Sequence, residues 1–138
     1  MNKKKILVVD DEVSITRLLK LNLERTGRFE VREENAGIMA VPAAREFRPD
    51  LILMDVMMPG MSGGDVAAEL RDDPALCQIP LVFLTAAVKR EEIGGSTARI
   101  AGRLYIAKPL NVREVIGVIE QYLPPPQAAT DRAGENAA

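Results

Sequence analysis

Short apolar runs alternate with stretches of helical periodicity along this chain. Five runs predict strands, because they are continuous or alternating and are bounded by turn formers; they occupy residues 5–9, 29–32, 51–54, 81–84 and 104–106. After the first run, apolar side chains recur at helical spacing, at Ile15, Leu18, Leu19 and Leu23, the stripe that a helix packs against a sheet. This alternation predicts an α/β protein: a (βα)₅ three-layer sandwich in which a parallel five-stranded sheet carries helices on both faces.

Local signals mark several helix ends. Gly27 follows the first expected helix, over residues 13–26, and is a typical C-terminal stop. Ser62 with Asp65 three residues on, and Asn111 ahead of the last expected helix, are typical N-cap signals. These positions locate helix boundaries independently of the hydrophobic pattern.

Two expected helices contain residues that disfavour a helix. Pro42 lies within residues 37–46, and proline costs about 3 kcal/mol in a helix interior, so this helix starts late, is kinked or is short. Gly94 and Gly95 interrupt the helix expected over residues 88–100, where each glycine costs about 1 kcal/mol. The fourth helix is therefore expected to be locally unstable.

The length of 138 residues suits one domain, which we expect over residues 1–123. Residues 124–138 begin with three prolines and contain no large apolar side chain from position 127 onward. Such a composition predicts a disordered tail. The tail is either a natural terminus or the start of a linker, and the sequence leaves both open.

Composition excludes several kinds of chemistry. The chain has no histidine and a single cysteine, Cys77, which excludes Ser-His and Cys-His nucleophile pairs, histidine-based zinc sites and an intramolecular disulfide. The net charge is −2 with little clustering of Lys and Arg, so direct nucleic-acid binding is not expected. The apolar run at residues 6–9 is too short for a membrane span, and we expect a cytoplasmic protein without membrane insertion.

Polar residues that suit a functional site stand within two positions of the ends of four predicted strands. They are Asp10 and Asp11, Asp55, Thr85 and Lys108, and the carboxyl ends of parallel strands form the crevice where α/β sheets bind ligands. Clustered carboxylates repel each other unless a cation lies among them, and Mg²⁺ suits a site of few carboxylates, water and a phosphate oxygen. With such an ion, a carboxylate is able to attack phosphorus, while a hydroxyl and an ammonium hold the phosphoryl oxygens.

Taken singly, each of these residues has a simpler interpretation. Asp10 and Asp11 are favourable residues at the start of a helix, and Asp55 is a common turn former ahead of Pro59. Lys108 beside a proline suits a solvated loop. Only the coincidence of all five residues at one sheet edge favours a functional site.

The motifs that carry this cluster resemble the receiver domain of two-component response regulators. The matching stretches are residues 9–12 (VDDE), 49–61 (PDLILMDVMMPGM), 79–86 (IPLVFLTA) and 105–109 (YIAKP), and the resemblance covers about residues 4–123. It implies a flavodoxin-like fold with strand order 2-1-3-4-5. It also implies a phosphoprotein that takes its phosphoryl group from a histidine kinase or a histidine phosphotransfer protein.

The resemblance assigns a role to each site residue. Asp55 is expected to accept the phosphoryl group, and Thr85 and Lys108 to bind its oxygens. Asp10, Asp11, Asp55 and the backbone carbonyl of Met57 are expected to hold Mg²⁺, for which Mn²⁺ is a substitute.

The resemblance also concerns the output of the signal. Tyr105 matches the family's switch aromatic, which moves together with Thr85, and the Lys108–Pro109 bond is expected to be cis. The face made by the fourth helix, the fifth strand and the fifth helix is expected to change on phosphorylation and to offer a surface for a dimer. Pro42, the two glycines at 94–95 and Arg103 depart from the family pattern, and put in doubt the common signalling route but not the pocket.

We therefore expect a phospho-accepting signalling switch rather than a classical enzyme. A phosphorelay intermediate or a receiver cut from a larger regulator is the first alternative. A degenerate receiver that only binds partners is less favoured, because all five pocket residues are present. A Mg²⁺-dependent phosphatase of the haloacid-dehalogenase type is disfavoured, because Met57 stands where that mechanism needs a second aspartate.

Overall fold

The computed structural model describes residues 3–86, 97–100 and 102–125. Its centre is a six-stranded sheet of order β2-β1-β3-β4-β6-β5. The strands are β1 (Lys4–Val9), β2 (Phe29–Glu34), β3 (Leu51–Asp55), β4 (Leu81–Thr85), β5 (Thr97–Ile100) and β6 (Arg103–Ala107). The strands from β2 to β6 along this order pair in parallel, which confirms the flavodoxin-like order predicted for the five parallel strands.

The sixth strand corrects the predicted fourth helix. Residues 97–100 form β5, which pairs antiparallel with β6 at the sheet edge, so a helix over residues 88–100 is wrong at its C-terminal end. Gly102, with φ of +80°, makes the tight connection between the two strands, because glycine adopts positive φ without a steric cost. Residues 87–96, including Gly94 and Gly95, lie outside the described residues.

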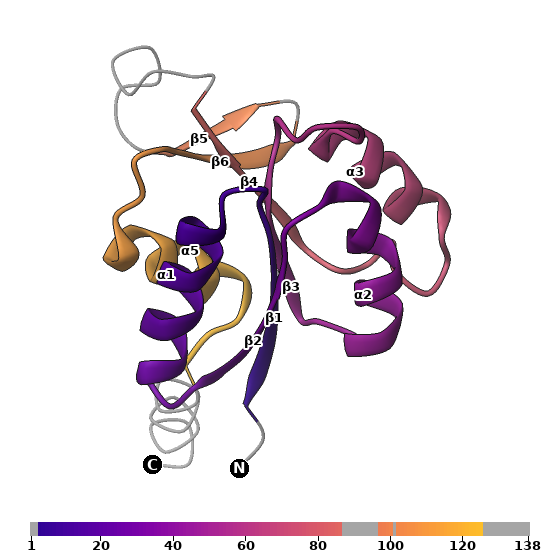
Figure 1. Ribbon diagram of the computed structural model, residues 1–138. Helices are drawn as coiled ribbons and strands as arrows, with labels where there is room; N and C mark the ends of the chain where they lie inside the picture. The colour runs from indigo at the N-terminus through magenta and orange to yellow at the C-terminus, as the bar shows by residue number, and fades with distance from the viewer. Residues whose placement is uncertain (1–2, 87–96, 101, 126–138) are drawn as a thin grey trace.

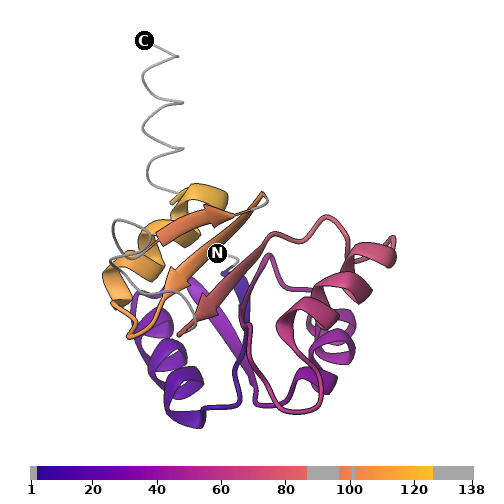
Figure 2. The same ribbon diagram turned by 90° about the horizontal axis from the view of Figure 1, so that it is seen from above.

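Helices cover both faces of the sheet (Figures 1 and 2). One face carries α1 (Val13–Arg25) and α5 (Val112–Tyr122); the other carries the 3₁₀ turn η1 (Gly37–Met39), α2 (Ala40–Phe47) and α3 (Gly63–Asp72). Side chains of β1 alternate between the two cores, with Ile6 and Val8 on the α1 side and Leu7 and Val9 on the α2 side. None of the helices in the described ranges has the length and apolar character that crossing a bilayer would require.

The late start of α2 explains how the chain accommodates Pro42. Because α2 begins at Ala40, Pro42 lies in the first helical turn, where its backbone nitrogen would have no intrahelical partner in any case. The helix starts later than the pattern suggested and is only eight residues long, which agrees with the predicted late start and short length.

Two helix starts have the predicted caps and one does not. Ser62 and Asp65 form a reciprocal capping box on α3, and the side chain of Asn111 accepts hydrogen bonds from two backbone N–H groups of α5. By contrast, α1 begins after Glu12, which makes no side-chain capping hydrogen bond. Its first turn must therefore be held by other contacts.

Candidate functional site

The carboxyl ends of β1, β3, β4 and β6 bring all five predicted site residues to one end of the sheet. Carboxylate oxygens of Asp10, Asp11 and Asp55 all lie within 4.8 Å of one another. Asp10 and Asp55 are 0% and 4% exposed and Thr85 is 2% exposed, whereas Asp11 is exposed. The site is therefore a buried pair of carboxylates with a third at its solvent side.

In the part of the chain that the structure describes, one ammonium group, that of Lys108, lies among these carboxylates. Lys108 Nζ is 2.8 Å from Asp10 Oδ2, 3.6 Å from Asp55 Oδ2 and 3.2 Å from Glu12 Oε1. The Lys108 backbone N–H donates to the Thr85 carbonyl at 2.8 Å, and the Lys108–Pro109 peptide bond is cis. The loop after β6 thus holds the lysine over the ends of β1 and β3.

The crowding of charge shifts the protonation of the buried groups. Burial, together with the charge of Asp10, raises the pKa of Asp55 to about 6. Burial also raises the pKa of Asp10, although Lys108 acts against it. Burial alone would lower the pKa of Lys108, but the surrounding carboxylates outweigh it and raise that pKa. One ammonium does not compensate the whole cluster, which is the condition under which carboxylates attract a further cation.

The hydrogen bonds argue against the simpler reading of Asp10. Its Oδ1 accepts from the backbone N–H of Glu12 at 2.9 Å, and Glu12 itself is the N-cap of α1. A helix N-cap accepts from the N–H groups two or three residues ahead, inside the helix. Asp10 instead closes the turn before the helix, and its other oxygen points to Lys108.

The loop after β3 fits closely against the neighbouring helix. The backbone N–H of Met57 approaches Asp55 Oδ1 at 3.4 Å, and the Met57 side chain is 69% exposed. Gly63 is the first residue of α3 and packs directly against the Asp55 carbonyl. A Cβ atom added to Gly63 would also lie 3.0 Å from the Phe83 ring. The start of α3 therefore fixes the backbone that carries Asp55.

The donor set fits a hard divalent cation. The three carboxylates offer oxygen ligands that lie within 4.8 Å of one another, and Mg²⁺ prefers such oxygen ligands together with water. The methionines near the loop do not alter this, because thioethers select soft metals.

Tyr105 lies beside the site rather than in it. Its ring stacks on Phe83, with centroids 5.1 Å apart and planes 27° from parallel, and its side chain is half-buried on the α2 side of the sheet.

Sequence reasoning missed the participation of Glu12, whose carboxylate contacts Lys108 across 96 positions. Its place directly after Asp10 and Asp11 was the available signal.

Comparison with known proteins agrees with this geometry. A family model described as the response regulator receiver domain matches residues 6–120. The polar-differentiation response regulator DivK of Brucella anthropi is 38% identical over 125 residues, covering 87% of this chain and 96% of that protein. The transcriptional regulatory protein ResD of Bacillus subtilis is 42% identical over 116 residues, covering 83% of this chain and 46% of that protein, so the chain spans about half the length of this relative.

A solved structure gives the same result for the fold. The chemotaxis response regulator CheY4 of Vibrio cholerae aligns with a TM-score of 0.72 and 25% identity, covering 88% of this chain and 99% of that chain. With the family match extending over residues 6–120 and the carboxylates assembled at the strand ends, this chain belongs to the response regulator receiver domains, which are phosphorylation-based signalling switches.

Proposed function

We propose that this chain accepts a phosphoryl group on Asp55 and uses the resulting aspartyl phosphate as its signal. The observation that carries the proposal is the position of Asp55, buried at 4% exposure between a second carboxylate and an ammonium. A carboxylate in such a place is costly for folding, and phosphoryl chemistry gives a reason for it.

In the proposed transfer, a carboxylate oxygen of Asp55 forms a bond to phosphorus as the bond between phosphorus and the donor's imidazole nitrogen breaks. The imidazole leaves with the electron pair and takes a proton from solvent. Lys108, 3.6 Å from Asp55, and Thr85, at the end of the neighbouring strand, are proposed to hold the phosphoryl oxygens, where fixed donors stabilise the charge that develops.

Asp10, Asp11, Asp55 and the Met57 carbonyl are proposed to hold Mg²⁺, with Mn²⁺ as a substitute. The ion would screen the carboxylates from the incoming phosphoryl group and neutralise charge on its oxygens. The chain's own contribution is to keep Asp10 and Asp55 close together, with the Lys108 ammonium within 4 Å of both.

The phosphoryl donor is proposed to lie outside these 138 residues, because they contain no histidine. A histidine kinase or a histidine phosphotransfer protein is the proposed partner. Tyr105, β6 and α5 are proposed to carry the change to a downstream protein or to a second copy of the chain. The face cannot contain a helix over residues 97–100, because β5 occupies them.

Phosphorylation with acetyl phosphate tests the proposal. Incubation with Mg²⁺ should add the mass of one phosphate, sensitive to hydroxylamine and absent from Asp55→Asn. Asp72→Asn is the matched control, because Asp72 is exposed at 79% and lies outside the site. An adduct that persists in Asp55→Asn, or no adduct on the native chain, would contradict the assignment.

A receiver that is part of a longer regulator is the second candidate, favoured by the 46% coverage of ResD, and a phosphorelay intermediate is the alternative to a terminal receiver. Both use the same pocket, so the difference lies in the fate of the phosphoryl group. Transfer from the phosphorylated chain to a phosphotransfer protein would identify an intermediate, whereas hydrolysis alone would identify a terminal receiver.

A further inference from the structure

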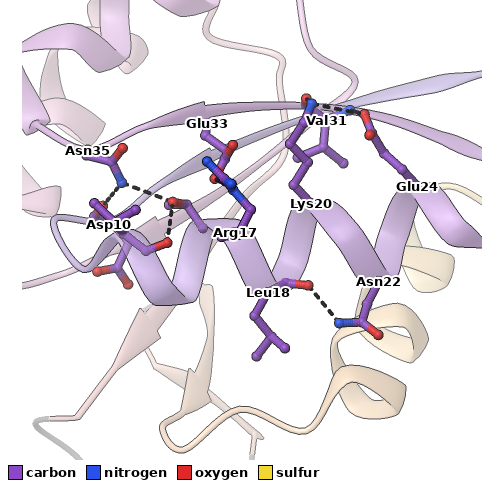
Figure 3. A network of polar contacts seen from close by, with 11 residues as sticks. Asp10, Arg17, Leu18, Lys20, Asn22, Glu24, Val31, Glu33 and Asn35 are labelled. Carbon is purple, nitrogen blue, oxygen red and sulfur yellow. Dashed lines mark hydrogen bonds and ion pairs between the residues drawn. The ribbon is translucent and has the colours of Figure 1, made fainter.

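Asn35 lies in the loop after β2 and reaches across to the backbone that carries Asp10 (Figure 3). Its Nδ2 donates to the Asp10 carbonyl at 2.8 Å and to Thr16 Oγ1 at 3.0 Å. Both amide hydrogens are thereby used, one on the end of β1 and one on the first turn of α1. The Asn35 side chain thus joins the end of β1 to the start of α1, the two elements between which Asp10 and Asp11 lie.

The contacts around Asn35 hold Asp10 from several directions. The Asp10 backbone N–H donates to the Glu34 carbonyl at 3.1 Å, so both polar groups of its peptide backbone are bound. Its Oδ1 accepts from the Glu12 N–H, and its Oδ2 lies 2.8 Å from Lys108. With the carbonyl held by Asn35, Asp10 has little freedom to turn its carboxylate.

Thr16 connects this arrangement to the helix. It is fully buried at 0% exposure, and its hydroxyl donates to the Val13 carbonyl at 3.1 Å while accepting from Asn35. Glu12 provides no side-chain cap for α1, but the contact between Asn35 and Thr16 ties the first turn of this helix to the loop after β2. Asp11 lies in the sequence between Asp10 and Thr16, the two residues that Asn35 contacts.

We infer that Asn35 and Thr16 are positioning residues that pre-organise Asp10 and Asp11 for a divalent cation. This inference rests on the proposed metal site, and it assigns to neither residue any contact with the ion. Residues that orient metal ligands typically change metal affinity about 10-fold or more when replaced. The same loss of a hydrogen bond elsewhere on α1 should leave the affinity unchanged.

Mn²⁺ binding, followed by the EPR signal of the free ion, tests the inference without requiring phosphorylation. Asn35→Ala should weaken Mn²⁺ binding about 10-fold at a temperature where circular dichroism shows the variant folded. Asn22→Ala is the matched control, because Asn22 Nδ2 also donates to a backbone carbonyl of α1, that of Leu18 at 2.8 Å, but on its exposed side (Figure 3). It should bind Mn²⁺ as the native chain does.

Thr16 supplies a second test that does not depend on the folding of Asn35→Ala. Thr16→Val removes the hydroxyl at nearly constant shape and should weaken Mn²⁺ binding, whereas Thr16→Ser keeps the hydroxyl and should restore it. If Thr16 has a purely structural role, Thr16→Val should have a lower melting temperature, but Thr16→Val and Thr16→Ser should bind Mn²⁺ with the same affinity.

Asn35→Asp separates positioning from charge. It adds a carboxylate near the cluster but replaces the donor that holds the Asp10 carbonyl, so positioning predicts weaker binding and simple attraction predicts tighter binding. Tighter binding, or Asn35→Ala within about two-fold of the native affinity, would overturn this inference alone. A native chain that binds no Mn²⁺ would overturn both it and the proposed metal site.

Discussion

At the carboxyl ends of β1 and β3, Asp10 and Asp55 are buried among neighbouring strands, whereas on β5 the side chains of Thr97, Arg99 and Ile100 are exposed. The first region lies between parallel strands covered by helices. The second is an antiparallel strand with a single neighbour, at the outer edge of the sheet.

This difference shows where each region takes its stability. In the sheet centre, the burial of apolar side chains offsets the free-energy cost of burying the carboxylates of Asp10 and Asp55. The two carboxylates therefore remain buried although they lower the stability of the fold. Among the described residues, β5 pairs with β6 alone and the side chains of Thr97, Arg99 and Ile100 are exposed, and regions with few buried contacts open most easily. The candidate site therefore lies where the surrounding side chains are most deeply buried.

Truncation of one isoleucine in each region should separate them most clearly. Ile52 on β3 is 1% exposed and packs in the α2-side core, whereas Ile100 on β5 is 43% exposed. Ile52→Ala should lower the free energy of unfolding by about 3 kcal/mol, and Ile100→Ala by about 0.5 kcal/mol or less. Urea denaturation measures both, and equal losses would show that β5 packs as tightly as the centre.

Replacement of Asp55 should stabilise the metal-free protein. The pKa of Asp55 is raised to about 6, above its ordinary value of 3.8, so between these values the folded state binds more protons and native stability falls as pH rises. Asp55→Asn escapes this loss and should be more stable by about 2 kcal/mol at pH 7.5, with the advantage disappearing near pH 4.

Urea denaturation in EDTA at these two pH values measures the effect, with Asp72→Asn as the exposed control. A gain that is the same at both pH values would show that the charge of Asp55 is not its cause.

The contact between α3 and the Asp55 backbone can be tested with two adjacent glycines. A Cβ on Gly63 would collide with the Asp55 carbonyl and press on Phe83, whereas on Gly64 it would meet only Ser62 Oγ at 3.6 Å. Gly63→Ala should cost about 1–2 kcal/mol by overpacking, and Gly64→Ala should be neutral or slightly stabilising. Thermal melts of the pair decide this, and similar midpoints would refute the close packing.

The accuracy of sequence interpretation varied between the same two regions. Strands in the centre are apolar on both faces, so the polar residue that ends the apolar run is identifiable, as with Asp55, the last residue of β3. At the edge, residues 97–100 carry two polar side chains and a glycine pair upstream, a pattern that fits a helix or a strand. Only pairing with β6 distinguishes them.

The sequence by itself located the five parallel strands to within one or two residues at each end, together with the capped starts of α3 and α5 and the set of residues that meet at the site. These depend on burial pattern and on contacts between residues close in the chain. The tertiary structure alone decided that β5 is a strand, that Glu12 contacts Lys108 and that Asn35 holds the Asp10 backbone. The last two contacts join residues 96 and 25 positions apart, and such pairs are selected by the packing of whole elements rather than by any local signal.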